Sequence, residues 1–363
     1  MKSPVSTYGF LNAKLRGKIS KMISEETFRQ MMEAGSFEEA VHVLNTTAYT
    51  SAVSTFEQTG DLLMSELEIE RIQQSLLQET DRYTRQFTNA VITAFTTMVF
   101  LRFDLANLKN ALRLWYERTI RGRSIEGKLP YLLRSTGVSG ISLESIVNAD
   151  SIEELMALTS SAPFASIIEK ALPLVIEEHS IFSLEIALDR WYYASLKSSA
   201  EALNTRDKTI AERLIGIEID TVNVNWIVRR QAFYDGMDRG AGITLLSGGL
   251  LAKSGVLENA LSSNHPARQL SQLFGDRMGI PSELPTQNDD AHTGSTARSL
   301  AFLEKLLKQQ LLYECRRVLG GYPFTIGVVL AYFALIQQEA RRIITVLNGK
   351  YYEMSPHRLE ALL

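Results

Sequence analysis

Apolar residues recur at helical spacing along most of the chain. In the segment RFDLANLKNALRLW (102–115), Leu105, Leu108, Leu112 and Trp115 are separated by three or four residues. Such positions share one face of an α-helix, which turns once every 3.6 residues. Stretches that alternate apolar and polar residues are few, and the dipeptides typical of β-hairpins are scarce. The pattern predicts an all-α fold with helix-on-helix packing throughout.

A polar trio occurs twice in this helical pattern, 116 residues apart. Each copy reads D-x-x-N, then five residues, then R: Asp104, Asn107 and Arg113 in the first, and Asp220, Asn223 and Arg229 in the second. On a helix, Asp104 and Asn107 lie on nearly the same side, whereas Arg113 points roughly the opposite way. We expect Asp104 to be an N-cap residue that starts a new helix after Phe103.

The repeated trio has two main interpretations. The favoured one is packing, in which each copy of a repeat docks on its neighbour through the same polar groups. The other is that the trio lines a central space that holds a partner, which makes Arg113, Arg229, Asn107 and Asn223 candidate partner-binding residues. Catalysis is disfavoured, because two identical trios so far apart resemble a fold element more than one active site.

Other segments repeat at almost the same offset. SFEEAVHVLNTTAYTS starts at Ser36, and SIEELMALTSSAPFAS starts 115 residues later at Ser151. In both, a serine precedes two glutamates and an apolar run, which is the chemistry of a helix N-terminus. LEIERIQQSLL (67–77) likewise pairs with LEIALDRWYYASL (184–196). Together these matches predict three copies of one helical plan.

We place the three copies at residues 1–102, 103–217 and 218–363. The third copy is the most degraded and carries a polar stretch, PSELPTQNDDAHTGSTARS (281–299). Its composition predicts an exposed flexible loop.

Two apolar stretches raise the question of a membrane span. Residues 318–338 are uncharged, but glycines and a proline interrupt the start, and the strongly apolar part (324–336) is only 13 residues long. That is short for a span, so we expect a buried core helix there and also at 89–101. The N-terminus does not resemble a signal peptide. A single cysteine, Cys315, fits a reducing, cytoplasmic compartment.

Composition and charge narrow the function classes. The 45% hydrophobic content is enough for a sizeable core, and the formal net charge of −3 argues against a nucleic-acid binder. No pattern specifies chemistry. GRSIEGKL (122–129) nearly spells a phosphate-binding loop but has Leu129 where Ser or Thr must bind magnesium. The five histidines lack a second ligand at metal spacing. We predict no catalytic site, cofactor or metal, and a structural role for Cys315.

Three longer segments together resemble a known family. They are YGFLNAKLRGKISKMIS (8–24), FRQMMEAGSFEEAVHVLNTTAY (28–49) and the closing FTIGVVLAYFALIQQEARRIITVLNGKYYEMSPHRLEALL (324–363). With the two D-x-x-N helices, they resemble the C-subunit family of prokaryotic V-type (A-type) rotary ATPases, whose eukaryotic counterpart is the d subunit. The chain departs from the family in the long 281–299 segment and in the third copy, where Glu339 and Arg342 only loosely echo the Asp and Asn.

The resemblance implies an all-helical funnel with threefold pseudosymmetry and a central cavity, and no enzymatic activity. It implies a single copy within a larger complex, peripheral on the cytoplasmic face of the membrane. The partners would be the D and F subunits of the shaft, in the mouth of the funnel, and the proteolipid rotor ring beneath it. A protein of this family couples ATP hydrolysis to H⁺ or Na⁺ translocation, or the reverse. A helical-repeat scaffold unrelated to rotary ATPases, and an enzyme with an unrecognised site, are the alternatives.

Overall fold

The computed structural model describes residues 3–125, 141–177, 179–233, 244–251, 255–261, 269–270, 292–355 and 358–360. Across these residues the regular structure is helical and no strand is present, so the all-α prediction is confirmed. The chain forms two compact units. Unit 1 contains Met1–Glu57 and Asn204–Leu363, and unit 2 contains Gln58–Leu203.

Unit 2 is built on three long helices with a group of short ones. The long helices are α5 (Leu62–Phe87), α6 (Ala90–Trp115) and α10 (Phe182–Glu201), and the short ones are α7 (Leu143–Asn148), α8 (Ile152–Thr159) and α9 (Ala165–Glu177). A π-helical turn, Tyr116–Ile120, extends α6. Helix α6 packs against α5, α7 and α10, and α10 packs against α9. The buried Phe95 and Trp115 place α6 at the centre of this unit.

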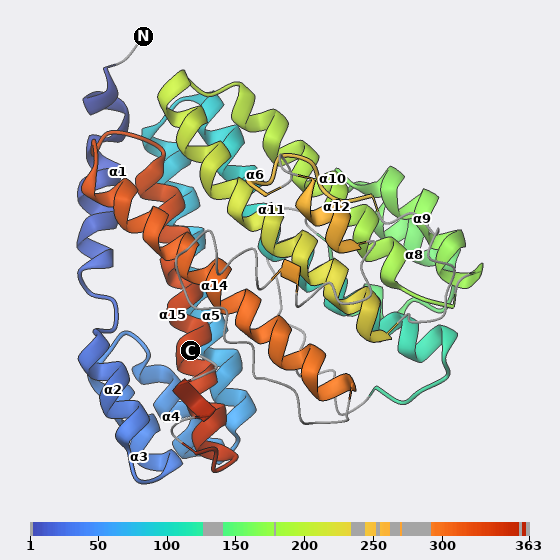
Figure 1. Ribbon diagram of the computed structural model, residues 1–363, viewed down its shortest axis with the longest axis horizontal. Helices are drawn as coiled ribbons and strands as arrows, with labels where there is room; N and C mark the ends of the chain where they lie inside the picture. The colour runs from blue at the N-terminus through green and yellow to red at the C-terminus, as the bar shows by residue number, and fades with distance from the viewer. Residues whose placement is uncertain are drawn as a thin grey trace. The chain divides into compact units, whose positions relative to one another are not determined.

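Unit 1 combines both ends of the chain. Its elements are α1 (Pro4–Ile19), α2 (Glu25–Glu33), α3 (Phe37–His42), a 3₁₀ turn (Val43–Thr46), the start of α4 (Thr50–Thr59), α11 (Thr205–Phe233), α12 (Val256–Leu261), α14 (His292–Gly320) and α15 (Gly327–Tyr351). Helix α14 packs on both α11 and α15. Figure 1 shows blue α1 beside red α15, so the last long helix lies against the first, and it also packs on α2 and α3.

The apolar start of α15 is the centre of unit 1. Residues Val328–Ala334 are all buried, as expected for a core helix. The glycines and proline ahead of it separate α14 from α15. Asp207 in the first turn of α11 fixes this junction, because its carboxylate accepts hydrogen bonds from the Tyr8 hydroxyl (2.6 Å) and the Ile326 amide (2.8 Å).

One helix in the described part of the chain, Ala90–Ile120, is long and apolar enough to cross a membrane by length and composition. Buried residues make up 56% of its most apolar window. The core helix of a soluble protein passes the same test, so this feature is weak evidence for a span.

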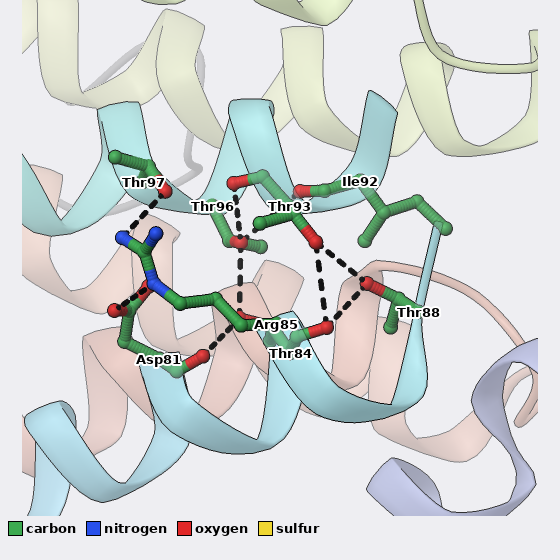
Figure 2. Close-up of polar contacts among 8 residues, drawn as sticks. All are labelled: Asp81, Thr84, Arg85, Thr88, Ile92, Thr93, Thr96 and Thr97. Carbon is green, nitrogen blue, oxygen red and sulfur yellow. Dashed lines mark hydrogen bonds and ion pairs between the residues drawn. The ribbon is translucent and has the colours of Figure 1, made fainter. Parts of the chain in front are cut away.

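The α5–α6 hairpin in unit 2 contains a line of threonine hydroxyls. Figure 2 shows Thr84 in α5 and Thr88, the residue that ends α5, facing Thr93 and Thr96 of α6. The Thr96 hydroxyl donates to Thr84 Oγ1 at 3.2 Å, and the Thr88 and Thr93 hydroxyls are 3.3 Å apart. Thr84 and Thr96 are fully buried. These bonds satisfy polar groups that would otherwise be costly between two packed helices.

The serine-led segments form the predicted helix N-termini. Ser36 Oγ accepts the Glu39 amide and Ser151 Oγ accepts the Glu154 amide, both at 3.2 Å. The glutamates reach back in turn: Glu39 accepts the Gly35 amide at 2.7 Å, and Glu154 accepts the Asp150 amide at 2.8 Å. In both sites the serine caps the helix and the glutamate binds the amide of the residue just before that serine, a close variant of the capping box. The predicted helix N-termini are confirmed.

The prediction that Asp104 is an N-cap is wrong. Helix α6 runs without a break from Ala90 to Trp115, and its N-cap is Asn89, whose side chain accepts the Ile92 amide. The helix continues through Asp104 because the apolar face on either side stays in register, and one aspartate costs a helix interior only a few tenths of a kcal/mol. The proposed boundaries at 102/103 and 217/218 therefore fall inside α6 and α11.

The loop expected at 281–299 differs from the structure in its last part. Residues 292–299 belong to α14, which starts at His292, so the loop prediction is wrong there. A long helix can begin with polar turns, and the apolar pattern resumes at Leu300. Residues 281–291 lie outside the described residues.

Candidate functional site

The second polar pair binds a neighbouring backbone. On α11, the Asn223 amide donates to the Leu246 carbonyl at 3.0 Å and accepts the Leu246 amide at 2.8 Å. Asp220, one turn earlier, accepts the Leu251 amide at 3.0 Å. Both side chains are buried. The pair therefore fixes the segment that leads into α12, and we call this arrangement the backbone clamp.

Gly249 shows how closely the clamped segment approaches α11. A Cβ added to Gly249 would lie 2.0 Å from Asp220 Oδ1. At this distance a Cβ would force Asp220 or the backbone to move, so glycine suits the point where the backbone passes over the carboxylate.

A similar clamp joins α15 to the N-terminal group of helices. Glu339 accepts the Ile23 amide at 2.5 Å and the Tyr49 hydroxyl at 2.8 Å. Arg342, three residues later, donates two hydrogen bonds to Glu25, at 2.6 and 2.7 Å, and its guanidinium lies over the Phe28 ring. As in α11, an acid and a second polar residue three positions on secure the segment that enters a group of short helices.

Burial dominates the electrostatics of the α15 clamp. It raises the pKa of Glu339, against the opposing effects of the Ile23 amide, the Tyr49 hydroxyl and the charge of Arg342. The pKa of Tyr49 is raised as well, by burial first and then by the Glu339 carboxylate. Tyr49 therefore remains a hydrogen-bond donor to Glu339 at neutral pH.

Helices α6 and α15 each donate a side-chain hydrogen bond to a backbone carbonyl just before a capping serine. Trp115 Nε1 donates to the Ala149 carbonyl at 3.0 Å, and Lys350 Nζ donates to the Ala34 carbonyl at 2.6 Å. Ala149 and Ala34 each lie two residues before a capping serine. Trp115 follows Asp104 by eleven residues, as Lys350 follows Glu339.

The candidate partner-binding residues fall into three categories. Asn107 and Asn223 are buried, and Asn223 belongs to the clamp. Arg113 is on the surface of unit 2, with 44% of its side chain exposed. The side chain of Arg229 lies outside the described residues, although α11 includes its backbone.

Arg113 forms one of two neighbouring ion pairs between α6 and α10. Its guanidinium contacts the Glu185 carboxylate and also donates to Asn110 at 2.9 Å. One turn earlier, Lys109 Nζ lies 2.7 Å from Asp189. The two cations are four residues apart on α6, and the two acids are four apart on α10. The two ion pairs therefore lie one helical turn from each other along the α6–α10 interface.

Sequence reasoning missed the role of Glu339. A signal existed, since Glu339 follows Asp220 by 119 residues, close to the 116 that separate Asp220 from Asp104. The sequence analysis noted Glu339 and Arg342 as a loose echo of the Asp and Asn but assigned them no role, because the acid is longer and an arginine replaces the asparagine.

The described residues include one cysteine, Cys315. They contain no group of three or more His, Cys, Asp or Glu placed to hold a metal ion. Cys315 is buried, and burial, then Glu218 and Glu314, raise its pKa to about 12. A thiol in that environment stays protonated and is a poor nucleophile.

The described residues define the class of the protein as an all-helical fold in which polar side chains fasten groups of helices together. The comparisons identify the family within that class: the chain belongs to the ATP synthase (C/AC39) subunit family, whose model matches residues 11–362. The predicted relationship to the C subunits of rotary ATPases is thereby confirmed.

Curated relatives agree along nearly the whole chain. The C subunit of the A-type ATP synthase of Methanocaldococcus jannaschii is 21% identical over 360 residues, covering 99% of this chain and 86% of the relative. The C subunits of the Methanosphaera stadtmanae and Pyrococcus horikoshii enzymes are 23% and 22% identical, covering 94% and 98% of this chain and 84% and 90% of theirs. The protein is therefore a rotary ATPase subunit.

Proposed function

We propose that this protein is the non-catalytic coupling subunit of the central stalk. In this role it links the rotating shaft, made of the D and F subunits, to the membrane ring of proteolipid subunits. It would lie on the cytoplasmic face as a peripheral protein, in one copy per complex. Coupling would serve ATP-driven ion transport or, in reverse, ATP synthesis. Family membership supports the proposal, and the observation that carries it is the backbone clamp on α11 together with the similar clamp on α15.

The clamp matters because a protein that transmits torque must resist deformation. Buried side chains that hydrogen-bond to backbone stiffen the loops between helices. The clamp on α11 uses only neutral and acidic groups fully removed from solvent. A catalytic protein would instead direct such groups into a cleft.

The clamp also supports the proposed threefold repeat and funnel. Helices α11 and α15 hold their helix groups by an acid and a residue three positions later. Helices α6 and α15 share the donor eleven residues after the acid. The first helix group, represented by α2 and α3, is held by α15 from the other end of the chain, as expected for three copies arranged in a closed cycle.

Arg113 is the best candidate among the described residues for a contact with the shaft. It is exposed. Its planar guanidinium can donate hydrogen bonds to a second carboxylate while it keeps its contact with Glu185. Arg229 is its counterpart on α11 in the repeat. Asn107 and Asn223, the other two candidate residues, are buried and would support these arginines from within their helices. Charged groups of this kind orient a partner without demanding one shape.

Copurification from membranes tests the proposal. The tagged full-length protein, expressed in its native complex and washed at rising salt, should elute together with the D and F subunits and, before the wash, with the ring. Arg113→Glu should weaken retention of the shaft about tenfold, the scale expected for loss of a charge-assisted contact. Arg71→Glu is the matched control, because Arg71 is an exposed arginine of unit 2 whose contact is with Glu68 on its own helix.

The outcome separates the alternatives. If the wild-type protein copurifies with neither the shaft nor the ring, the scaffold alternative outside the rotary complex replaces this proposal. If the complex is intact and Arg113→Glu retains the shaft as well as Arg71→Glu does, Arg113 is only a packing residue and the coupling role stands without it.

A further inference from the structure

Two arginines and one buried carboxylate join helices α11 and α14 of unit 1, which pack along each other (Figure 1). The carboxylate belongs to Glu314 of α14 and is fully buried. Its Oε1 lies 2.8 Å from Nη2 of Arg213 on α11, and its Oε2 accepts a hydrogen bond from Arg317 Nε at 2.8 Å. We call Arg213 and Arg317 the arginine pair.

The arginine pair carries more positive charge than Glu314 neutralises. One carboxylate offsets one of the two guanidinium groups, and 46% of the Arg213 side chain and 50% of the Arg317 side chain remain exposed. Glu212, the residue before Arg213, lies 3.8 Å from Lys208 and so has a cation of its own. A guanidinium has several N–H donors. Within the described part of the chain Glu314 is the acid that both arginines contact, so donors of both remain available at the surface.

The buried position of Glu314 is better explained by orientation than by stability. Removing a carboxylate from water is costly, and an apolar side chain of similar size often stabilises a fold as well as a buried ion pair does. A buried acid does hold two long side chains in place. Side chains that are already ordered lose less entropy when they bind a partner, so the arginine pair is preorganised.

An exposed tyrosine lies beside the arginine pair. Tyr313 is four residues before Arg317 on α14, so the two side chains share one side of the helix. The tyrosine is 60% exposed. Tyrosine and arginine are among the residues that contribute most to the binding energy of protein interfaces. Their combination on one helix surface is typical of an interaction site.

We propose that the arginine pair and Tyr313 form a docking site for an acidic segment of a protein partner. A Glu or Asp side chain of the partner would accept two parallel hydrogen bonds from one guanidinium, and the tyrosine ring would pack against the partner's chain. The inference goes beyond the coupling role, because the site lies in unit 1 and does not depend on Arg113 or on the shaft.

The charges favour a protein partner over a membrane or a nucleic acid. Recognition of anionic lipids uses clusters of about four to eight lysines and arginines, whereas the arginine pair supplies two cations against one acid. Nucleic-acid binding requires a broad basic excess, and this chain has a formal net charge of −3. A single carboxylate matches the planar edge of one guanidinium.

The test uses the full-length protein and a short poly-glutamate peptide as the probe. NMR of ¹⁵N-labelled arginine follows the Nε–H signals, which Arg213→Lys and Arg317→Lys assign. The peptide should shift both signals, and about 0.5 M NaCl should reverse the shift by screening. Lysine keeps the charge that neutralises Glu314 but lacks the planar fork. Each lysine variant should therefore bind the peptide about fivefold more weakly, with little change in Tm.

Two further variants complete the test. Tyr313→Ala leaves both arginines in place and should weaken peptide binding about fivefold. Arg71→Lys is the matched control, since Arg71 is an exposed arginine of unit 2 that contacts Glu68 on its own helix, and it should bind as the wild type does.

Three results would overturn the inference. The first is wild-type affinity in the two lysine variants or in Tyr313→Ala. The second is an equal loss of affinity in Arg71→Lys. The third is binding to phosphatidylserine vesicles that depends on the arginine pair while the peptide does not bind.

Discussion

Replacing Asn223 with alanine separates the two interpretations of the repeated polar trio. Asn223 is fully buried, and its amide makes two hydrogen bonds to the backbone of Leu246. The substitution leaves one buried N–H and one buried C=O without these partners and opens a small void. A buried polar group that loses its partner costs about 1–3 kcal/mol. We therefore expect Asn223→Ala to lower the free energy of unfolding of unit 1 by about 3 kcal/mol.

Hydrogen exchange at the Leu246 amide measures this loss locally. If the clamp limits opening of the segment, a loss of about 3 kcal/mol accelerates exchange of that amide on the order of 10²-fold. Urea unfolding followed by circular dichroism should show a matching decrease in midpoint. Asn225→Ala is the matched control: it lies on the same helix, and its Oδ1 accepts no hydrogen bond within the described part of the chain. It should change stability by less than about 1 kcal/mol.

One result would refute the clamp interpretation. In that result, the Asn223→Ala variant keeps the wild-type stability and hydrogen-exchange protection at Leu246 but no longer copurifies with the shaft. Asn223 would then be a partner contact, and a different element would hold residues 244–251.

The remaining predictions concern three other contacts. Gly249→Ala forces a Cβ against Asp220. The free energy of unfolding should fall by about 2 kcal/mol or more, and the Tm should fall by several degrees. An unchanged Tm would mean that the backbone yields easily. Thr96→Val removes the hydroxyl that donates to Thr84, and urea unfolding should show a loss of about 1 kcal/mol. Because the pKa of Glu339 is raised, its contribution to stability is greatest below the ordinary carboxyl pKa and decreases as pH rises through the raised value; Glu339→Gln should flatten this part of the pH profile of Tm.

Local signals predicted the helices and their starts. The serine caps at Ser36 and Ser151 depend on residues within one helical turn, so their pattern can be read directly from the sequence. The burial of α15 also followed from its apolar composition and the glycines and proline before it.

Features that depend on distant partners could not be read in this way. Whether a helix stops at Asp104 or continues depends on what covers its apolar face, and α6 continues because α5, α7 and α10 pack around it. Asn223 is a backbone clamp only because residues 244–251 return to α11. The sequence contains the two polar groups but no indication of which backbone they bind.

The contacts of α15 show how the first helix group is fastened. On α11 and on α15 the acid of the clamp belongs to a long helix, and the first group has no such helix before it in the chain. Glu339 and Arg342 supply the missing contacts from the opposite end, and Lys350 adds the contact to Ala34. In a linear repeat protein the terminal copies have only one neighbour. Here the N-terminal helices are held by the C-terminal helix, so both ends of the chain contribute to one unit. In the proposed coupling role this arrangement would resist torque, because the terminal helices are fastened to one another.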